Sequence, residues 1–297
     1  MKILVTGASG FVGRNLREQF GSGDCAGKYE ISAPSHVELD LTDGESVDAY
    51  FKNRSFDAVV HCAVKPGHRN AKDLSGLYFA NTRMFFNLLK NERSFGKMIW
   101  LGSGLVYDAR HYEPLIGEDF FGGHIPQDEG GFAKYVCARF TETDRKVIEL
   151  RPFGVYGKYE DYAIRFISNA VCKTLAGLPV TIKQNRRFDY IHVADLIRVI
   201  DFFLCNEAKS SAYNVTSARP VELLEIARKI VELGGRKNEI LISLDGMGAE
   251  YSGSNARLKA EMPVYSVTPL EEGIRGLFDF YSANLSGLDM DALKTDR

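Results

Sequence analysis

Short apolar runs alternate with longer amphipathic stretches through the first half of the chain. The short runs are rich in β-branched residues and predict strands over residues 3–5, 29–33, 58–62, 98–101 and 147–150. The longer stretches repeat their apolar positions at helical spacing and predict helices over residues 11–20, 44–52, 74–91 and 131–143. Because crossover connections fit between successive strands, the pattern predicts an α/β fold built on a doubly wound parallel sheet with both faces covered.

The pattern is looser in the second half. It predicts helices over residues 162–175, 193–204 and 221–233, and strands over residues 180–182 and 213–215. No internal repeat or low-complexity linker divides the chain. We therefore expect a sheet domain formed by residues 1–153 and about 188–208, and a smaller interleaved lobe formed by residues 154–187 and about 209–282. The remaining polar tail, residues 283–297, is expected to be partly disordered.

Composition narrows the class of ligand. The 297 residues are 45% hydrophobic and 26% charged, and the formal net charge of -2 gives no electrostatic reason to expect nucleic acid or an anionic membrane as a partner. The five cysteines are scattered and never form a CxxC pair, which predicts neither a disulfide framework nor a metal site. The apolar run at the start is too short for a signal peptide, and no stretch approaches a membrane span. We expect a soluble protein of the reducing cytoplasm.

A glycine-rich segment follows the first predicted strand and opens the first predicted helix. Its residues are Gly7, Ala8, Ser9, Gly10, Phe11, Val12 and Gly13. In this context the first glycine permits a tight turn, the second lets the backbone approach a pyrophosphate, and the third lets the helix lie close to the sheet. The N–H groups at the helix N-terminus then face the phosphates. The segment predicts a dinucleotide-binding site.

The end of the second predicted strand bears on which dinucleotide binds. Sites for NAD usually place an acidic residue there to hold the ribose 2′-hydroxyl. Residues 31–36 contain no carboxylate, whereas Ser35, His36 and Arg14 are suited to a 2′-phosphate. The sequence therefore favours NADP and leaves NAD open.

Beyond the glycine-rich segment, further motifs resemble those of the extended short-chain dehydrogenases/reductases, also called the NAD-dependent epimerase/dehydratase family, which act mainly on nucleotide sugars. The resemblance runs from residue 1 to about residue 281. It is carried by residues 6–13, Asp40-Leu41, residues 60–63, Asn81, residues 103–107, Lys134, residues 151–157 and residues 188–195. The resemblance implies a Rossmann-type fold with a smaller C-terminal substrate lobe.

The resemblance also implies roles for single residues. Asp40 and Leu41 would border the adenine, Ala63 would line the cofactor path, and Phe153 and Val155 would lie at the nicotinamide end. Many relatives pair through the helices predicted here over residues 74–91 and 131–143. The first of these helices carries more apolar residues than one core-facing stripe needs, which favours a homodimer: Phe79, Met84, Phe85 and Phe86.

The catalytic pattern of the family is incomplete in this chain. Moving a hydride between a nicotinamide and a carbonyl carbon also requires a proton on oxygen, which the family supplies with a serine or threonine and a Tyr-x-x-x-Lys helix turn. Ser103 and Lys134 match, but Gly130 stands where the tyrosine is expected. Tyr135 would point about 100° away on the helix, and Tyr107 occupies a position where the family has a second tyrosine as well as the catalytic one.

Two explanations of Gly130 stay open at this point: an engineered substitution that removed the tyrosine, or a naturally divergent member. Unless a substrate hydroxyl, a water or a more distant side chain replaces the tyrosine, the chain is expected to be slow or inert, because losing a positioned general acid lowers the rate by about 10²–10⁴-fold. A non-catalytic NAD(P)-binding protein is the alternative of another class.

By the same resemblance, Leu105 argues against two of the reactions that the family catalyses. Relatives that remove water carry acidic residues after the equivalent strand, and relatives that epimerise beside a ketone carry a cysteine at the position of Leu105. Reduction of a 4-keto nucleotide sugar is therefore favoured, with 4-epimerisation as the alternative. Among the cations available for the substrate diphosphate, Arg186 and Arg187 are the best candidates because they precede a predicted return to the sheet domain.

Overall fold

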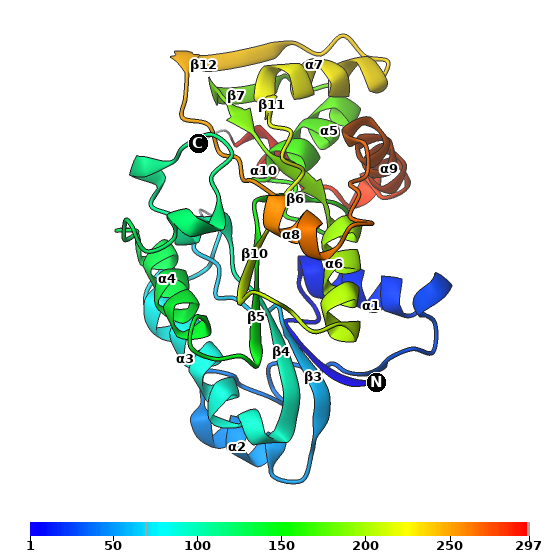
Figure 1. Cartoon of the computed structure of the whole chain (residues 1–297). Coiled ribbons are helices and arrows are strands. Elements are labelled where there is room, and N and C mark those ends of the chain that lie inside the picture. The colour runs from blue at the N-terminus through cyan, green and yellow to red at the C-terminus, as the bar shows by residue number, and fades with distance from the viewer. Residues whose placement is uncertain (69, 296–297) are drawn as a thin grey trace.

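The computed structural model describes residues 1–68 and 70–295. A six-stranded sheet lies at its centre in the order β10-β5-β4-β3-β1-β2, and every pairing within it is parallel (Figure 1). The strands are β1 (Lys2–Thr6), β2 (Glu30–Ser32), β3 (Phe56–His61), β4 (Phe95–Leu101), β5 (Val147–Pro152) and β10 (Ala212–Val215). The predicted doubly wound parallel sheet is confirmed.

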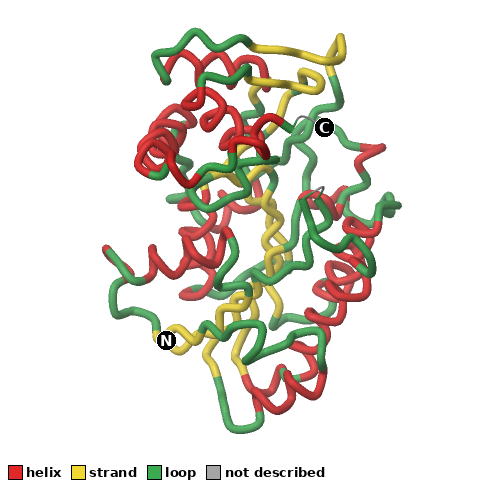
Figure 2. The backbone as a smooth tube through the Cα atoms, turned by 180° about the vertical axis from the view of Figure 1, so that it is seen from behind, coloured by secondary structure: helices red, strands yellow, loops and turns green. Residues whose placement is uncertain are grey.

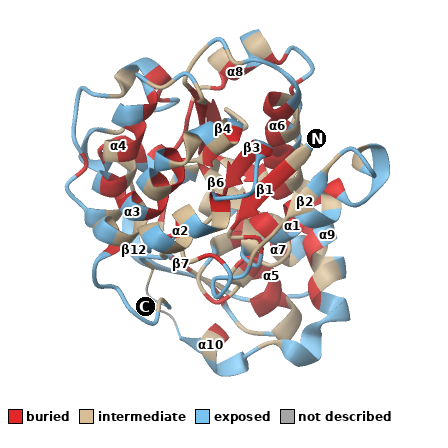
Figure 3. Ribbon diagram, turned by 90° about the horizontal axis from the view of Figure 1, so that it is seen from below, coloured by how far each residue is buried: buried red, intermediate tan, exposed pale blue. Residues whose placement is uncertain are grey.

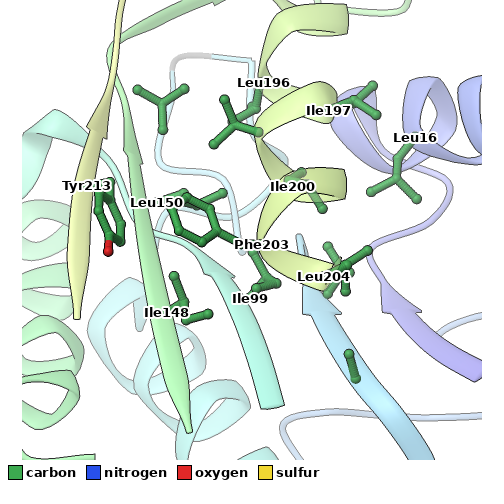
Figure 4. Packing of buried hydrophobic residues seen from close by; sticks show 14 of the residues in the cluster. Leu16, Ile99, Ile148, Leu150, Leu196, Ile197, Ile200, Phe203, Leu204 and Tyr213 are labelled. Atoms are coloured by element: carbon green, nitrogen blue, oxygen red, sulfur yellow. The ribbon is translucent and has the colours of Figure 1, made fainter. Parts of the chain in front are cut away.

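Helices cover both faces of this sheet. One face carries α1 (Phe11–Phe20) and α6 (Val193–Cys205), and the other carries α2 (Gly44–Phe51), α3 (Leu77–Lys90) and α4 (Glu129–Thr141) (Figure 1). On the first face, side chains of α1 and α6 pack against those of the strands, as Figure 4 shows for Leu16, Leu196, Ile200, Ile99 and Leu150. Since both faces are covered, all six residues of β5 are buried, and the strands appear as a buried layer in Figure 3.

A smaller lobe caps the carboxyl end of the sheet (Figure 2). Its helices and strands are α5 (Phe166–Ala176), β7 (Val180–Asn185), α7 (Leu223–Leu233), β12 (Ile240–Met247), α9 (Leu270–Ala283) and α10 (Met290–Lys294). These elements share a hydrophobic core of their own, to which Val171, Ile226 and Ile274 contribute.

Short strands connect the two parts. β6 (Gly154–Tyr156) pairs with β9 (Tyr190–His192), and β8 (Arg187–Phe188) pairs with β11 (Val221–Glu222). A short helix, α8 (Ala256–Glu261), returns to the sheet domain and packs against β10. None of these four strands was predicted, because two or three residues carry too little periodicity to identify an element.

Two features differ from the expected boundaries. β10 lies in the large sheet beside β5, although the sequence placed residues after about 208 in the smaller lobe. All four of its residues are buried, as expected for a strand inside a covered parallel sheet. The tail also has structure: Leu293 of α10 is buried in the core of the smaller lobe, and the backbone N–H of Asp289 donates to the Tyr162 hydroxyl. The last two residues of that tail lie outside the described residues.

Within the described part of the chain, no helix combines the length and the apolar character needed to cross a membrane.

Candidate functional site

A cavity of about 1870 Å³ opens at the carboxyl end of the sheet. Strand order reverses here, since β1 has β2 on one side and β3 on the other. Ligands of open α/β sheets bind at such a switch point. The cavity extends from the glycine-rich segment after β1, past the ends of β3, β4 and β5, to residues of the smaller lobe such as Arg186 and Tyr251.

The glycine-rich turn has a strict steric requirement for its glycines. Gly7 has a φ of +65°, and a β-carbon on it would lie 2.7 Å from the backbone of Ala63 after β3. A β-carbon on Gly13 would lie 2.3 Å from the carbonyl oxygen of Gly7. The two glycines therefore let α1 start close to the strand ends.

The N-terminus of α1 faces the cavity. The first N–H groups of a helix have no partner within it, and no side chain caps them here, where Gly10 is the N-cap residue. Ser9, Phe11 and Val12 line the cavity beside Gly10. This arrangement of free donors and a positive helix end fits a pyrophosphate. Arg14 is absent from the lining, and its guanidinium lies 3.7 Å from the centre of the Tyr159 ring.

The opposite end of the cofactor region holds a carboxylate that the sequence analysis missed. Ser35, His36, Asp40 and Leu41 all line the cavity there, as expected. Glu38 lines it too, and its carboxylate accepts hydrogen bonds of 2.8 Å from both the backbone N–H and the hydroxyl of Ser35. The donors from Ser35 lower the pKa of Glu38. A negative charge therefore stands beside the residue expected to meet a 2′-phosphate. Glu38 lies two residues beyond the end of the segment 31–36, in which the sequence predicted the cofactor preference.

The catalytic candidates meet at the middle of the cavity. Ser103 Oγ accepts from the backbone N–H of Leu105 at 3.1 Å. Lys134 Nζ donates to the carbonyl oxygens of Leu101 and Gly102, at 3.4 and 3.2 Å, and burial lowers the pKa of Lys134. Ala63, Phe153 and Val155 line the same region.

Gly130 also lines the cavity, in the first turn of α4. A β-carbon there would meet only the Asp128 carboxylate, at 3.5 Å, so a larger side chain has room. Gly131 differs, because a β-carbon on it would lie within 3.0 Å of three atoms, including the carbonyl oxygen of Leu105. Close packing of α4 therefore explains Gly131 but not Gly130.

Two tyrosines that the sequence did not favour as replacements for the missing catalytic tyrosine lie outside the site. Neither Tyr107 nor Tyr135 is among the residues that line the cavity. The Tyr107 hydroxyl is buried and donates to the side chain of Asn214 at 2.8 Å, and burial raises its pKa to about 12. Tyr135 packs its ring against Phe121.

Two other tyrosines do reach the catalytic centre. Tyr112 and Tyr251 both line the cavity. The Tyr112 hydroxyl donates to the carbonyl oxygen of Gly104 at 2.6 Å, and the Tyr251 hydroxyl lies 2.6 Å from the point that a β-carbon on Gly104 would occupy. Burial raises the pKa of both phenols, so both carry their protons at neutral pH. Sequence spacing held no signal for Tyr251, because the fold alone brings it to Ser103.

A buried ion pair supports the floor of this region. Arg151 donates to Glu149 at 2.8 Å, and it also donates to the Tyr107 hydroxyl at 3.0 Å. Burial raises the pKa of Glu149, and the charge of Arg151 opposes that shift. The Glu149 carboxylate lies directly under Gly102, where a β-carbon would be 2.5 Å from its oxygen. The pair therefore fixes the backbone just before Ser103.

Of the two arginines predicted to bind the substrate diphosphate, one lines the cavity and the other lies on the surface. Arg186 lines the cavity, as do Lys183 and Arg165, so three cations face it from the smaller lobe. Arg187 is exposed and absent from the lining. It donates to the carbonyl oxygen of Pro220 at 3.1 Å and lies 3.7 Å from the carboxylate of Glu250.

The fold and this site belong to a class already known. The family model described as the NAD dependent epimerase/dehydratase family matches residues 3–216, and the chain belongs to that family. Its fold is of the Rossmann type, as the resemblance implied.

Relatives with assigned activities match most of the chain. GDP-L-colitose synthase of Yersinia pseudotuberculosis is 26% identical over 80% of this chain and 83% of its own length. The dTDP-4-dehydro-6-deoxy-D-allose reductase of Streptomyces bikiniensis is 29% identical over 80% of this chain and 82% of its own. Among solved structures, a GDP-D-glycero-L-gluco-heptose synthase from Campylobacter jejuni, crystallised in the presence of NADPH, superposes with a TM-score of 0.82. It is 17% identical, with 95% of this chain and 98% of that chain covered.

Proposed function

We propose that this protein reduces the 4-keto group of a nucleotide sugar with a nicotinamide cofactor. The observation that carries the proposal is one continuous cavity that joins an uncapped helix N-terminus after β1, the pair Ser103 and Lys134, and three cations of the smaller lobe. The helix N-terminus can bind the pyrophosphate of a dinucleotide. Ser103 and Lys134 suit chemistry at a carbonyl group, and the three cations can bind the diphosphate of the sugar nucleotide.

The bound cofactor supplies the hydride. The chain's own residues position the partners: the backbone of the glycine-rich segment holds the pyrophosphate, and Ser103 donates a hydrogen bond to the substrate carbonyl oxygen. Lys134 places a positive charge at the end of β4, where its charge favours negative charge developing on that oxygen. Arg186, with Lys183 and Arg165, binds the sugar nucleotide diphosphate.

We prefer reduction to 4-epimerisation for two reasons, the activity named for one relative and the protonation of two tyrosine hydroxyls in the cavity. The Streptomyces bikiniensis relative is a reductase of a 4-dehydro sugar. Epimerisation at C4 would begin with oxidation of an alcohol, which requires a base, whereas burial raises the pKa of Tyr112 and Tyr251 and keeps both phenols in the protonated form that a reduction needs.

For the reductant we propose NADPH, the cofactor named for the Campylobacter jejuni neighbour. Glu38 opposes this choice because its carboxylate would repel a 2′-phosphate. Arg17 lines the cavity and supports the choice. The balance of these charges sets the preference between NADPH and NADH.

We also propose a homodimer. Of the four apolar residues singled out on α3, Met84 and Phe85 are buried in the core, and Phe79 and Phe86 are exposed. The adjacent helix α4 exposes Phe132 and Phe140. Exposed phenylalanines on two neighbouring helices form a surface typical of a subunit contact. The cytoplasmic location stays a prediction.

A non-catalytic cofactor-binding protein is the competing account, and Gly130 is the observation that favours it. The test is to titrate the protein and its Gly130→Tyr variant with NADPH and NADH by fluorescence. A panel of 4-keto and 4-hydroxy nucleotide sugars is then added, and absorbance of the reduced cofactor is followed. Turnover by either protein supports the reductase. Cofactor binding without turnover by either one contradicts it.

A further inference from the structure

We propose that Tyr251 is the proton donor of this site, in place of the tyrosine that position 130 lacks. The inference rests on the proposed carbonyl reduction. The Tyr251 hydroxyl lies over the backbone of Gly104, the residue after Ser103, and Tyr251 and Ser103 line the same cavity. A carbonyl oxygen held by Ser103 is therefore within reach of the phenol.

The backbone of Tyr251 is fixed to the connecting strand β8. Tyr251 forms a β-bridge with Phe188. Its N–H donates to the carbonyl oxygen of Arg187 at 3.0 Å, and its carbonyl oxygen accepts from the N–H of Asp189 at 2.9 Å. These two bonds hold the residue in place although it lies outside any helix or named strand.

The ring of Tyr251 is held as firmly as its backbone. Its centre lies 4.8 Å from the ring centres of both Phe153 and Phe188, and 5.2 Å from that of Tyr112. Phe153 is one of the residues expected at the nicotinamide end. The phenol is thereby aimed at the reacting centre by packed aromatic rings, as a general acid must be.

Tyr112 lies beside the proposed donor. Its hydroxyl donates to the carbonyl oxygen of Gly104 at 2.6 Å, and both tyrosines line the cavity. The Tyr112 ring packs edge-on against the Tyr251 ring. Tyr112 therefore helps to hold the Tyr251 ring beside the cavity, from which water can return a proton.

The step balances in atoms and electrons. With hydride, two electrons and one hydrogen, supplied to the carbonyl carbon by bound NADPH, the carbonyl oxygen would take up one proton. The O–H bond of Tyr251 would break as the new O–H bond forms on the sugar oxygen. The phenolate left on Tyr251 would take a proton from water in the cavity. The positive charge of Lys134 near Ser103 stabilises negative charge on both oxygens in turn.

Position 130 has space for a larger side chain. A tyrosine there would enter the same cavity from α4, since among the described residues the Asp128 carboxylate is what a β-carbon at that position would meet. With glycine at position 130 no phenol enters from α4, and the phenol of Tyr251 enters the cavity from the loop after β12 instead.

The experiment compares four full-length proteins: the natural sequence, Tyr251→Phe, Tyr251→Phe with Gly130→Tyr, and Tyr135→Phe as the control. NADPH binding is followed by fluorescence, binding of a 4-hydroxy nucleotide sugar by calorimetry, and turnover by absorbance with 4-keto nucleotide sugars carrying dTDP or GDP. We expect Tyr251→Phe to lower turnover by about 10²–10⁴-fold. We expect it to weaken binding of the 4-hydroxy sugar roughly 2- to 10-fold, with NADPH affinity unchanged.

The control Tyr135→Phe should behave as the natural protein does, and adding Gly130→Tyr should restore part of the turnover lost in Tyr251→Phe. If the natural protein turns over and Tyr251→Phe matches it, the proposal is overturned and the reductase assignment stands. If only proteins carrying Gly130→Tyr turn over, the scaffold is a reductase and Tyr251 is not its acid. If every protein binds NADPH and none turns over, the reductase assignment itself fails.

Discussion

The hydroxyl of Tyr251 lies directly over the backbone of Gly104, 2.6 Å from the point that a β-carbon on this glycine would occupy. No real β-carbon tolerates an oxygen that close. The phenol therefore reaches Ser103 only because residue 104 has no side chain. Gly104 and Tyr251 form one unit of the site, although nearly half of the chain separates them in sequence.

This relationship predicts the effect of Gly104→Ala. The new methyl group would also lie within 3.0 Å of the Phe153 ring, so the Tyr251 hydroxyl has to move away from Ser103. We expect turnover to fall about 10²-fold, the loss typical of a displacement near 1 Å at a reacting centre, while NADPH affinity is kept. Gly117→Ala is the matched control, because no atom lies within 4 Å of its β-carbon position. Equal turnover in the two variants would show that the phenol position is irrelevant.

Glu38 is expected to set the cofactor preference. Replacing it with glutamine removes the negative charge beside Ser35 and keeps the shape of the side chain. The Kd of NADPH should fall relative to that of NADH by about 10-fold, because the substitution removes a negative charge that would repel the 2′-phosphate. Glu45→Gln, at the exposed start of α2, is the control. A variant in which both affinities change by the same factor would place the 2′-phosphate elsewhere.

His61 predicts a pH dependence of stability. Its ring nitrogen Nδ1 is hydrogen-bonded to the Thr6 hydroxyl at 2.8 Å. Burial, with a smaller effect of the Lys134 charge, lowers its pKa from 6.5 to about 3. The folded state thus keeps His61 neutral where the unfolded chain binds a proton. Its contribution to the free energy of unfolding is complete above pH 6.5 and decreases as the pH falls towards 3.

At pH 5 the loss attributable to His61 should be about 2 kcal/mol relative to pH 7. Urea unfolding of the natural protein and of His61→Asn at several pH values measures it. The variant lacks the titrating group, so its stability should fall less steeply with acid. Parallel pH profiles for the two proteins would mean that His61 titrates alike in both states.

The exposed phenylalanine rings of α3 and α4 predict a dimer contact. Replacing these rings with polar side chains should disrupt the dimer. The rings of Phe86 and Phe140 lie 5.5 Å apart on the outer surface of the two helices. The natural protein should have twice the mass of one chain by light scattering, and the double variant Phe86→Ser and Phe140→Ser should be a monomer that still binds NADPH. Leu244→Ser, on the exposed strand β12, is the control and should stay dimeric. A monomeric natural protein contradicts the proposed contact.

Much of the larger domain was predictable because its periodicity is strong. The helix over residues 11–20 was predicted with the bounds of α1, and the predicted strands lie on β1 to β5 and β10. Apolar runs buried on both faces of a parallel sheet leave a clear pattern in sequence. The short strands β6, β8, β9 and β11 left none, since their pairing depends on the packing of the lobe against the sheet.

The candidate site was predictable only where a local motif identifies its residues. Gly7 and Ser103 follow strands and Lys134 lies on a helix, and the fold brings all three to one cavity. Glu38 was missed because a turn from Ser35 folds its carboxylate back beside that residue. Tyr251 was missed because a bridge to Phe188, rather than any nearby motif, places it.

The central claim is that this chain, with glycine at position 130, transfers hydride to a 4-keto nucleotide sugar. The most direct measurement mixes the natural protein with NADPH and dTDP-4-dehydro-6-deoxyglucose, or its GDP-linked counterpart. It follows reduced-cofactor absorbance while the sugar is analysed by NMR. The account predicts stoichiometric loss of NADPH and of the keto group, with a new C4 alcohol as the product. Bound NADPH that stays unoxidised with both sugars would contradict it.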